Sequence, residues 1–76
     1  MLLENIDRLH TTELGIKRIK KNLKLECNDV VEYIKNKVLD NNAYIYKNGK
    51  NYYVEIENII ITINSLNFCI ITAHIK

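Results

Sequence analysis

The feature that most constrains the fold of this chain is a change in the spacing of its apolar residues near Ala43. Before Ala43, apolar residues recur every three or four positions, as along one side of an α-helix, whereas after it they alternate with polar residues, as in a β-strand. The alternating part contains Asn48-Gly49, and this dipeptide between two alternating runs is the strongest short signal for a β-hairpin. Helices are therefore expected first, and antiparallel strands after them.

Three helices are expected in the first 40 residues. The first is a short amphipathic helix with an apolar stripe formed by Leu2, Leu3, Ile6 and Leu9. Thr12 before Glu13 is typical of an N-cap, because a threonine hydroxyl can accept a hydrogen bond from a free amide, and the second helix should run to about Leu23. Asn28 and Asp29 repeat this pattern and begin a third helix, which buries Val30, Val31, Ile34 and Val38.

The hairpin also predicts which strand residues face each other. A type I′ turn with Asn48 and Gly49 at its central positions, both at positive φ, pairs Lys47 with Lys50. Side chains alternate between the two faces of a strand. The face that packs against the helices should therefore carry Tyr52, Val54 and Ile56.

Two further turns extend the hairpin into a meander. Glu57-Asn58 leads to a third strand, 59–64, and Ser65-Leu66 leads to a fourth strand, 67–75. If both turns are tight, the helix-facing side is completed by Ile59, Ile61, Ile63, Phe68 and Ile70. The opposite side then carries Tyr53, Thr62, Cys69, Ile71 and Ala73.

The predicted fold class is α+β, with two or three N-terminal helices packed on one face of a four-stranded antiparallel β-meander. With 76 residues, no proline and two glycines, the chain offers little material for linkers, so residues 1–76 are expected to form a single domain. Such a meander has two edges. We expect a helix or a terminal segment to cover an edge, or a homodimer to pair it.

Several classes of protein are excluded by the composition. No apolar run approaches the roughly 20 residues of a membrane span, and charged residues interrupt the start where a signal peptide would be apolar. A cytoplasmic protein that does not bind membranes is expected. Two cysteines without a C-x-x-C spacing, and two histidines that are not an i, i+4 pair, predict no metal site. The chain has no glycine-rich phosphate loop, and no cofactor is expected.

The positive charge of the chain is concentrated in one segment. The net charge is only +2, but KRIKKNLK (17–24) carries five positive charges and no acidic residue. Such a block can face the phosphates of a nucleic acid. It can equally be the solvated side of a helix, so the charge alone leaves both interpretations open.

Polar residues near the ends of the expected elements are the candidates for chemistry. RNA cleavage by internal transfer needs a base for the 2′-hydroxyl proton, an acid for the leaving oxygen, and cations that stabilise the charge on phosphorus. The candidate catalytic residues of a metal-independent endoribonuclease are His10, His74, Arg18 and Lys50. The candidate substrate-binding residues are Thr11, Thr12, Lys17, Lys20, Lys21, Asn51, Tyr53, Asn64 and Thr72.

Each candidate also has a structural interpretation. His10 can end the first helix, Thr11 and Thr12 can cap the second, and His74 can be an exposed strand end. Two alternatives to an enzyme therefore stay open: a non-catalytic binding module for RNA or for a protein partner, or a small structural homodimer. An endoribonuclease needs His10 close to His74, whereas an RNA binder needs only the cations and exposed aromatic residues.

Four segments of the chain resemble a family of small bacterial proteins. They are HTTELGIKRIKKNL (10–23), KNYYVEI (50–56), IITIN (60–64) and IITAH (70–74). The family is known as domain-of-unknown-function family 3781, and the resemblance covers nearly the whole chain. It implies no established activity. The layout of helices followed by a meander is also similar to the small RNase toxins of the RelE and barnase-like groups, which by analogy of fold implies a toxin-like endoribonuclease.

Overall fold

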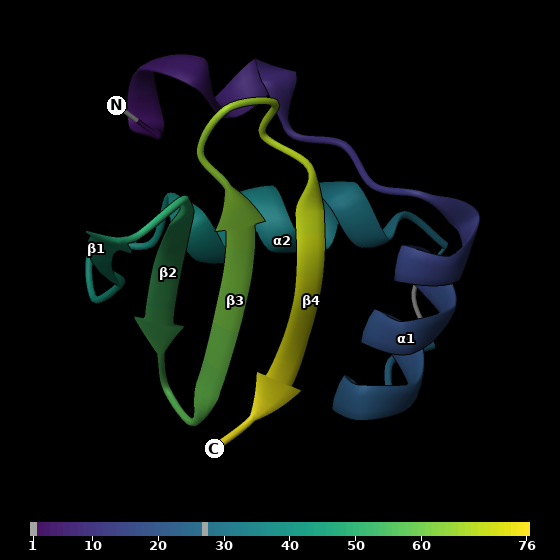
Figure 1. Cartoon of the computed structure of the whole chain (residues 1–76). Helices are drawn as coiled ribbons and strands as arrows, with labels where there is room; N and C mark the ends of the chain where they lie inside the picture. The colour runs from purple at the N-terminus through teal and green to yellow at the C-terminus, as the bar shows by residue number, and fades with distance from the viewer. Residues whose placement is uncertain (1, 27) are drawn as a thin grey trace.

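Seven elements follow one another in the predicted order, helices before strands (Figure 1). The structure is a computed structural model that describes residues 2–26 and 28–76. Its elements are the 3₁₀-helix η1 (Leu3–Arg8), the α-helices α1 (Glu13–Leu23) and α2 (Val30–Val38), and the strands β1 (Tyr44–Asn48), β2 (Asn51–Ile56), β3 (Ile59–Asn64) and β4 (Ile70–Ile75). The first predicted helix is thus a 3₁₀-helix. Among the described residues, no helix is long and apolar enough to cross a membrane.

Both α-helices begin at the predicted capping residues. Thr12 Oγ1 accepts a hydrogen bond from the Gly15 N–H at 3.0 Å. Asp29 Oδ1 accepts one from the Glu32 N–H, also at 3.0 Å. These bonds satisfy amides that have no partner inside the helix, so the sequence signals mark the true helix starts.

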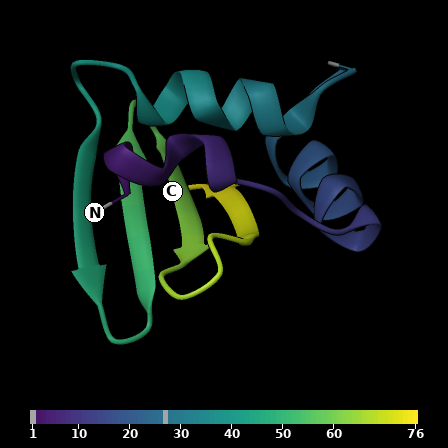
Figure 2. The same ribbon diagram turned by 90° about the horizontal axis from the view of Figure 1, so that it is seen from above.

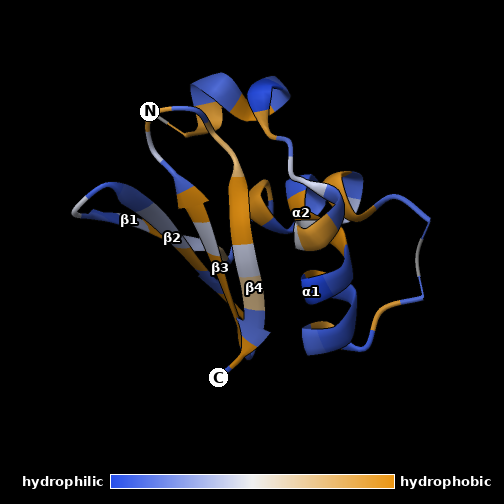
Figure 3. Ribbon diagram, turned by 45° about the vertical axis from the view of Figure 1, so that its right-hand side comes forward, coloured by the Kyte–Doolittle hydropathy of each residue, from blue (hydrophilic) through white to orange (hydrophobic). Residues whose placement is uncertain are grey.

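The four strands form one antiparallel sheet in the order β1-β2-β3-β4. Helix α2 lies across one face of this sheet, while α1 lies beside β4 (Figures 1 and 2). No helix formed by the described residues covers the other face, which turns away from α1 and α2 in Figure 3. The predicted α+β meander with helices on one side is confirmed.

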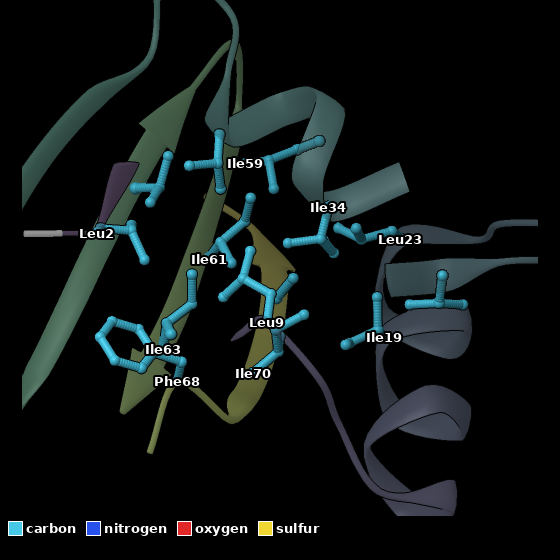
Figure 4. Packing of buried hydrophobic residues seen from close by; sticks show 14 residues of the cluster. Leu2, Leu9, Ile19, Leu23, Ile34, Ile59, Ile61, Ile63, Phe68 and Ile70 are labelled. Carbon is cyan, nitrogen blue, oxygen red and sulfur yellow. The ribbon is translucent and has the colours of Figure 1, made fainter. Parts of the chain in front are cut away.

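Apolar side chains from the sheet and the helices fill the space between the two layers (Figure 4). The core cluster consists of Leu2, Leu9, Ile19, Leu23, Val30, Ile34, Val38, Val54, Ile59, Ile61, Ile63, Phe68, Ile70 and Ala73. Every residue predicted for the helix-facing side of the third and fourth strands is buried. Burial of such side chains contributes about 1.5–3 kcal/mol each.

The predicted register of the first hairpin is wrong by two residues. Asn48 pairs with Asn51, so the central residues of the turn are Gly49 and Lys50, and Lys47 pairs with Tyr52 instead of Lys50. Gly49 has a φ of 64°, whereas Lys50 is not among the described residues with positive φ. Positive φ at the first central position alone is the pattern of a type II′ turn, which needs glycine only there.

The prediction for Ala73 is also wrong, because the fourth strand carries a bulge. Ile63 pairs with Ile70 while Thr62 pairs with Thr72, which leaves Ile71 as an extra residue in β4. The extra residue reverses the alternation after it. Ala73 consequently lies on the helix-facing side, where its side chain is fully buried.

The outer edge of β4 is occupied, as expected for one edge of the meander. His10 forms a short parallel bridge there, and the Ile70 N–H donates to the His10 carbonyl at 2.7 Å. The Thr11 hydroxyl donates to the Ile70 carbonyl at 2.9 Å. In the last turn of α1, Asn22 Nδ2 donates to the Ala73 carbonyl at 3.2 Å.

Candidate functional site on the open face of the sheet

The face of the sheet opposite α2 carries five of the thirteen residues predicted for the site. We call it the open face. From the strand pairing and the alternation of side chains, it is formed by Tyr44, Tyr46, Asn48, Asn51, Tyr53, Glu55, Ile60, Thr62, Asn64, Thr72 and His74. In Figure 1 the viewer looks onto this side, with α2 behind the sheet. Asn51, Tyr53, Asn64, Thr72 and His74 were all predicted as site residues.

Three tyrosines form a row of neighbouring rings on the open face. The ring centroids of Tyr44 and Tyr46 are 5.3 Å apart, and those of Tyr46 and Tyr53 are 5.5 Å apart with nearly parallel planes. Tyr44 stands at the outer end of the row and is 64% exposed. This ring can therefore receive a further aromatic group.

The carboxylate on the open face is engaged by its neighbours. Glu55 Oε1 lies 2.6 Å from Lys76 Nζ. The hydrogen bond from Lys76, and after it the bond from the Tyr46 hydroxyl, hold the pKa of Glu55 below its usual value. The same bond to Glu55 raises the pKa of Tyr46, because the hydroxyl must keep its proton to donate.

Two predicted cations border the open face on opposite sides. Asn22 Nδ2 lies 3.4 Å from Thr72 Oγ1, so the Asn22 side of α1 adjoins this face. Arg18 is four residues earlier and shares that side of the helix. Lys50 lies in the β1–β2 turn at the far border, beside Asn51.

The remaining predicted cations, Lys17, Lys20 and Lys21, are also on α1. Among the described residues, none of these cations, nor Arg18 or Lys50, forms an ion pair with a carboxylate.

The two histidines of the endoribonuclease hypothesis lie at opposite ends of β4. His10 is beside Cys69, where the strand begins, and its Nδ1–H donates to the Arg8 carbonyl at 2.9 Å. His74 pairs with Ile60 near the other end. Five residues of extended chain separate the two positions along the strand, which is about 16 Å. These positions do not by themselves bring the two imidazoles to one phosphate.

The hydroxyls of Thr11 and Thr12 make structural hydrogen bonds. Thr11 closes the edge of β4, and Thr12 caps α1. Both residues were predicted to bind substrate, and the structure places these two oxygens within the fold's own network of bonds. The cations and the open-face residues therefore carry the candidate site.

Some residues of the candidate site are not among those predicted from the sequence. Tyr44 and Tyr46 belong to the tyrosine row, and the correct hairpin register would have revealed Tyr46 as the neighbour of Tyr53. Asn22, which joins α1 to β4, carries one weak signal: it follows Arg18 by four residues, so the two share one side of a helix.

An apolar cavity of about 390 Å³ lies between η1 and the first hairpin. It is lined by Leu2, Leu3, Glu4, Ile45, Tyr46, Lys47 and Tyr52, and none of these is a predicted site residue. Within the described ranges, no three His, Cys, Asp or Glu side chains are grouped so that they could hold a metal ion.

Comparisons with known proteins name no activity for this chain. No curated protein and no solved structure matches it. One family does match, over residues 3–74, and its description reads "Protein of unknown function (DUF3781)". Since the match includes every helix and all but the last residue of the sheet, the chain belongs to this family of proteins of unknown function.

Proposed function

We propose that this protein is a non-catalytic binding module for single-stranded RNA, and that the open face is its binding surface. The observation that carries the proposal is the distribution of charge around this face. Arg18 and Lys50 border it without a carboxylate partner among the described residues, while the Glu55 carboxylate on it is neutralised by Lys76. The two cations at the border of this face are therefore available to bind an anionic ligand.

The chemistry of the open face suits a single strand with accessible bases. Arg18 and Lys50 can contact backbone phosphates, an interaction that dominates affinity for nucleic acids. The exposed ring of Tyr44 offers a surface on which a base can stack. The Asn51 amide and the Tyr53 hydroxyl can exchange hydrogen bonds with base edges or with a 2′-hydroxyl.

The endoribonuclease hypothesis has less support. It requires His10 and His74 at one phosphate, and their positions at opposite ends of β4 do not supply that arrangement. Binding needs no such convergence, since the cations and aromatic rings act at successive nucleotides.

The proposal is tested by measuring the affinity of a fluorescently labelled single-stranded RNA by anisotropy, over a series of salt concentrations. Arg18→Ala and Lys50→Ala should each weaken binding and reduce the slope of log K against log salt by about 0.7, the value for one lost phosphate contact. Lys35→Ala is the matched control, because it removes the same charge from α2, behind the sheet. Equal effects of all three substitutions would contradict the proposed surface.

The stacking part of the proposal has its own pair of variants. Tyr44→Ala should weaken binding by about 1–3 kcal/mol, whereas Tyr44→Phe, which keeps the ring, should bind nearly as the wild type does. The same RNA, recovered from the binding reaction and analysed on a gel, should be intact. Cleavage that disappears in His74→Ala would refute the non-catalytic assignment.

A further inference from the structure

The two edges of the sheet are unlike each other. The outer edge of β4 is covered from Phe68 to Ala73 by His10, Thr11 and Asn22. No hydrogen bond among the described residues reaches the outer edge of β1, and no helix lies beyond it (Figures 1 and 3). An uncovered edge is a row of free N–H and C=O groups that can pair with another strand.

The backbone groups that β1 offers at this edge can be identified from the pairing. In a two-residue hairpin the residues that flank the turn exchange both hydrogen bonds, so Asn48, and with it Tyr46 and Tyr44, bond to β2. Ile45 and Lys47 then direct their N–H and C=O outward. The same alternation applies to the neighbouring strands. Asn51 bonds to β1, so its partner Asn64 on β3 should bond to the segment on its other side, the last strand. Asn64 does form these bonds, which supports the assignment for Ile45 and Lys47.

The asymmetry of the edges restricts how two copies of this chain can associate through their sheets. Because β4 is occupied, a second copy can pair only by its own β1, and the same surface is then used on both sides. Such an interface has two-fold symmetry and closes at two copies. It cannot propagate into a filament.

We infer that β1 is a self-association surface, through which two copies pair antiparallel and join their sheets into one of eight strands. The two-fold axis passes beside Tyr46, so that Ile45 of each copy exchanges hydrogen bonds with Lys47 of the other. In this register no lysine faces a lysine, whereas pairing centred on Lys47 would place two like charges opposite each other. This inference does not depend on RNA binding.

Side chains on both faces of β1 favour pairing with a second copy of this chain over pairing with an unrelated strand. On the open face, the row of Tyr44, Tyr46 and Tyr53 would meet its own copy across the axis, where the close approach of non-hydrogen-bonded pairs suits aromatic rings. On the other face, Leu3 is 51% exposed at the rim of the apolar cavity next to β1. Two copies would bring these apolar surfaces together.

The first test is the molar mass of the purified chain in solution, measured by sedimentation or light scattering across a concentration series. A five-residue strand pair is a small interface, so dissociation should fall between about 1 μM and 1 mM. Lys47→Pro should raise the dissociation constant about tenfold or more, because symmetry removes two hydrogen bonds at once. The control, Lys47→Ala, keeps the N–H and should remain dimeric.

The second test uses only the wild type, and so it does not depend on whether the proline variant folds. Amide hydrogen exchange at Ile45 and Lys47 should slow as the concentration rises, while the amides of Tyr46 and Asn48 should be protected throughout. A monomer at every concentration overturns the inference and leaves the edge for an extended segment of another protein. A dimer in which Ile45 and Lys47 exchange as fast as in the monomer overturns it as well.

Discussion

Gly15 shows how closely the start of α1 is fitted to the last strand. A Cβ atom at this position would overlap Thr11 Oγ1, the oxygen that donates to the Ile70 carbonyl. Rotation of the threonine could relieve the overlap only by giving up that bond, at a cost of about 1 kcal/mol. Glycine therefore stands here in spite of its low helix propensity, because a Cβ atom would displace the Thr11 hydroxyl that bonds to β4.

The contacts of Glu55 predict a specific dependence of stability on pH. Lys76 first, and Tyr46 second, lower the folded-state pKa of Glu55 below its ordinary value of 4.5. This contribution to the free energy of unfolding is fully present above pH 4.5 and is lost as the pH falls through the lowered pKa. Thermal melts between about pH 2 and 7 should show a smaller loss of stability in Glu55→Gln than in the wild type. Parallel curves for the two proteins would show that the contact contributes nothing.

At the scale of the elements, the sequence predicts which face of the sheet a side chain lies on better than it predicts which residues pair across two strands. The hairpin register is wrong by two residues, but a shift of two keeps every side chain on its face, so Tyr52, Val54 and Ile56 are placed correctly. The bulge in β4 shifts the alternation by one instead, and it moves Ala73 to the other side. Hydrophobic periodicity cannot reveal a bulge when small or polar residues follow it.

The first hairpin gives a prediction about its turn. Gly49→Val should lower the free energy of unfolding by about 1 kcal/mol or more, because a β-branched residue is strained at a φ of 64°. A Cβ there would meet no atom within 4 Å, so the cost is conformational and not steric crowding by neighbours. Urea denaturation measures the change. Lys50→Ala in the same turn should have little effect, and similar losses for both variants would argue against a type II′ turn.

For the molecule as a whole, the fold class could be predicted from the sequence, whereas the candidate site could be predicted only in part. Capping residues and the change of period specify helices followed by a meander, and local signals are sufficient for that. The site depends on long-range placement. His10 and His74 look equivalent in the sequence, yet the pairing of residue 10 with the beginning of β4 and of residue 74 with Ile60 places them at opposite ends of one strand.

The closure of the β4 edge predicts the assembly behaviour of the whole molecule. In the double variant Thr11→Ala, Asn22→Ala, the carbonyls of Ile70 and Ala73 lose their side-chain partners, so the part of the β4 edge beyond the His10 bridge can pair as well as the β1 edge. Head-to-tail association then no longer closes, and light scattering should detect growing oligomers. Gly49→Val serves as a control that is destabilised but keeps this edge covered. If it aggregates equally, loss of stability and not the open edge is responsible.

The bond between Thr11 and Ile70 spans 59 positions of the chain, and this has a consequence during synthesis. The N-terminal segment has no place to dock until β4 has left the ribosome, so the nascent chain must carry α1 without its partner strand for most of translation. The yield of this protein in a cell should therefore respond to the speed of translation through the last strands more than to substitutions that strengthen the isolated helix.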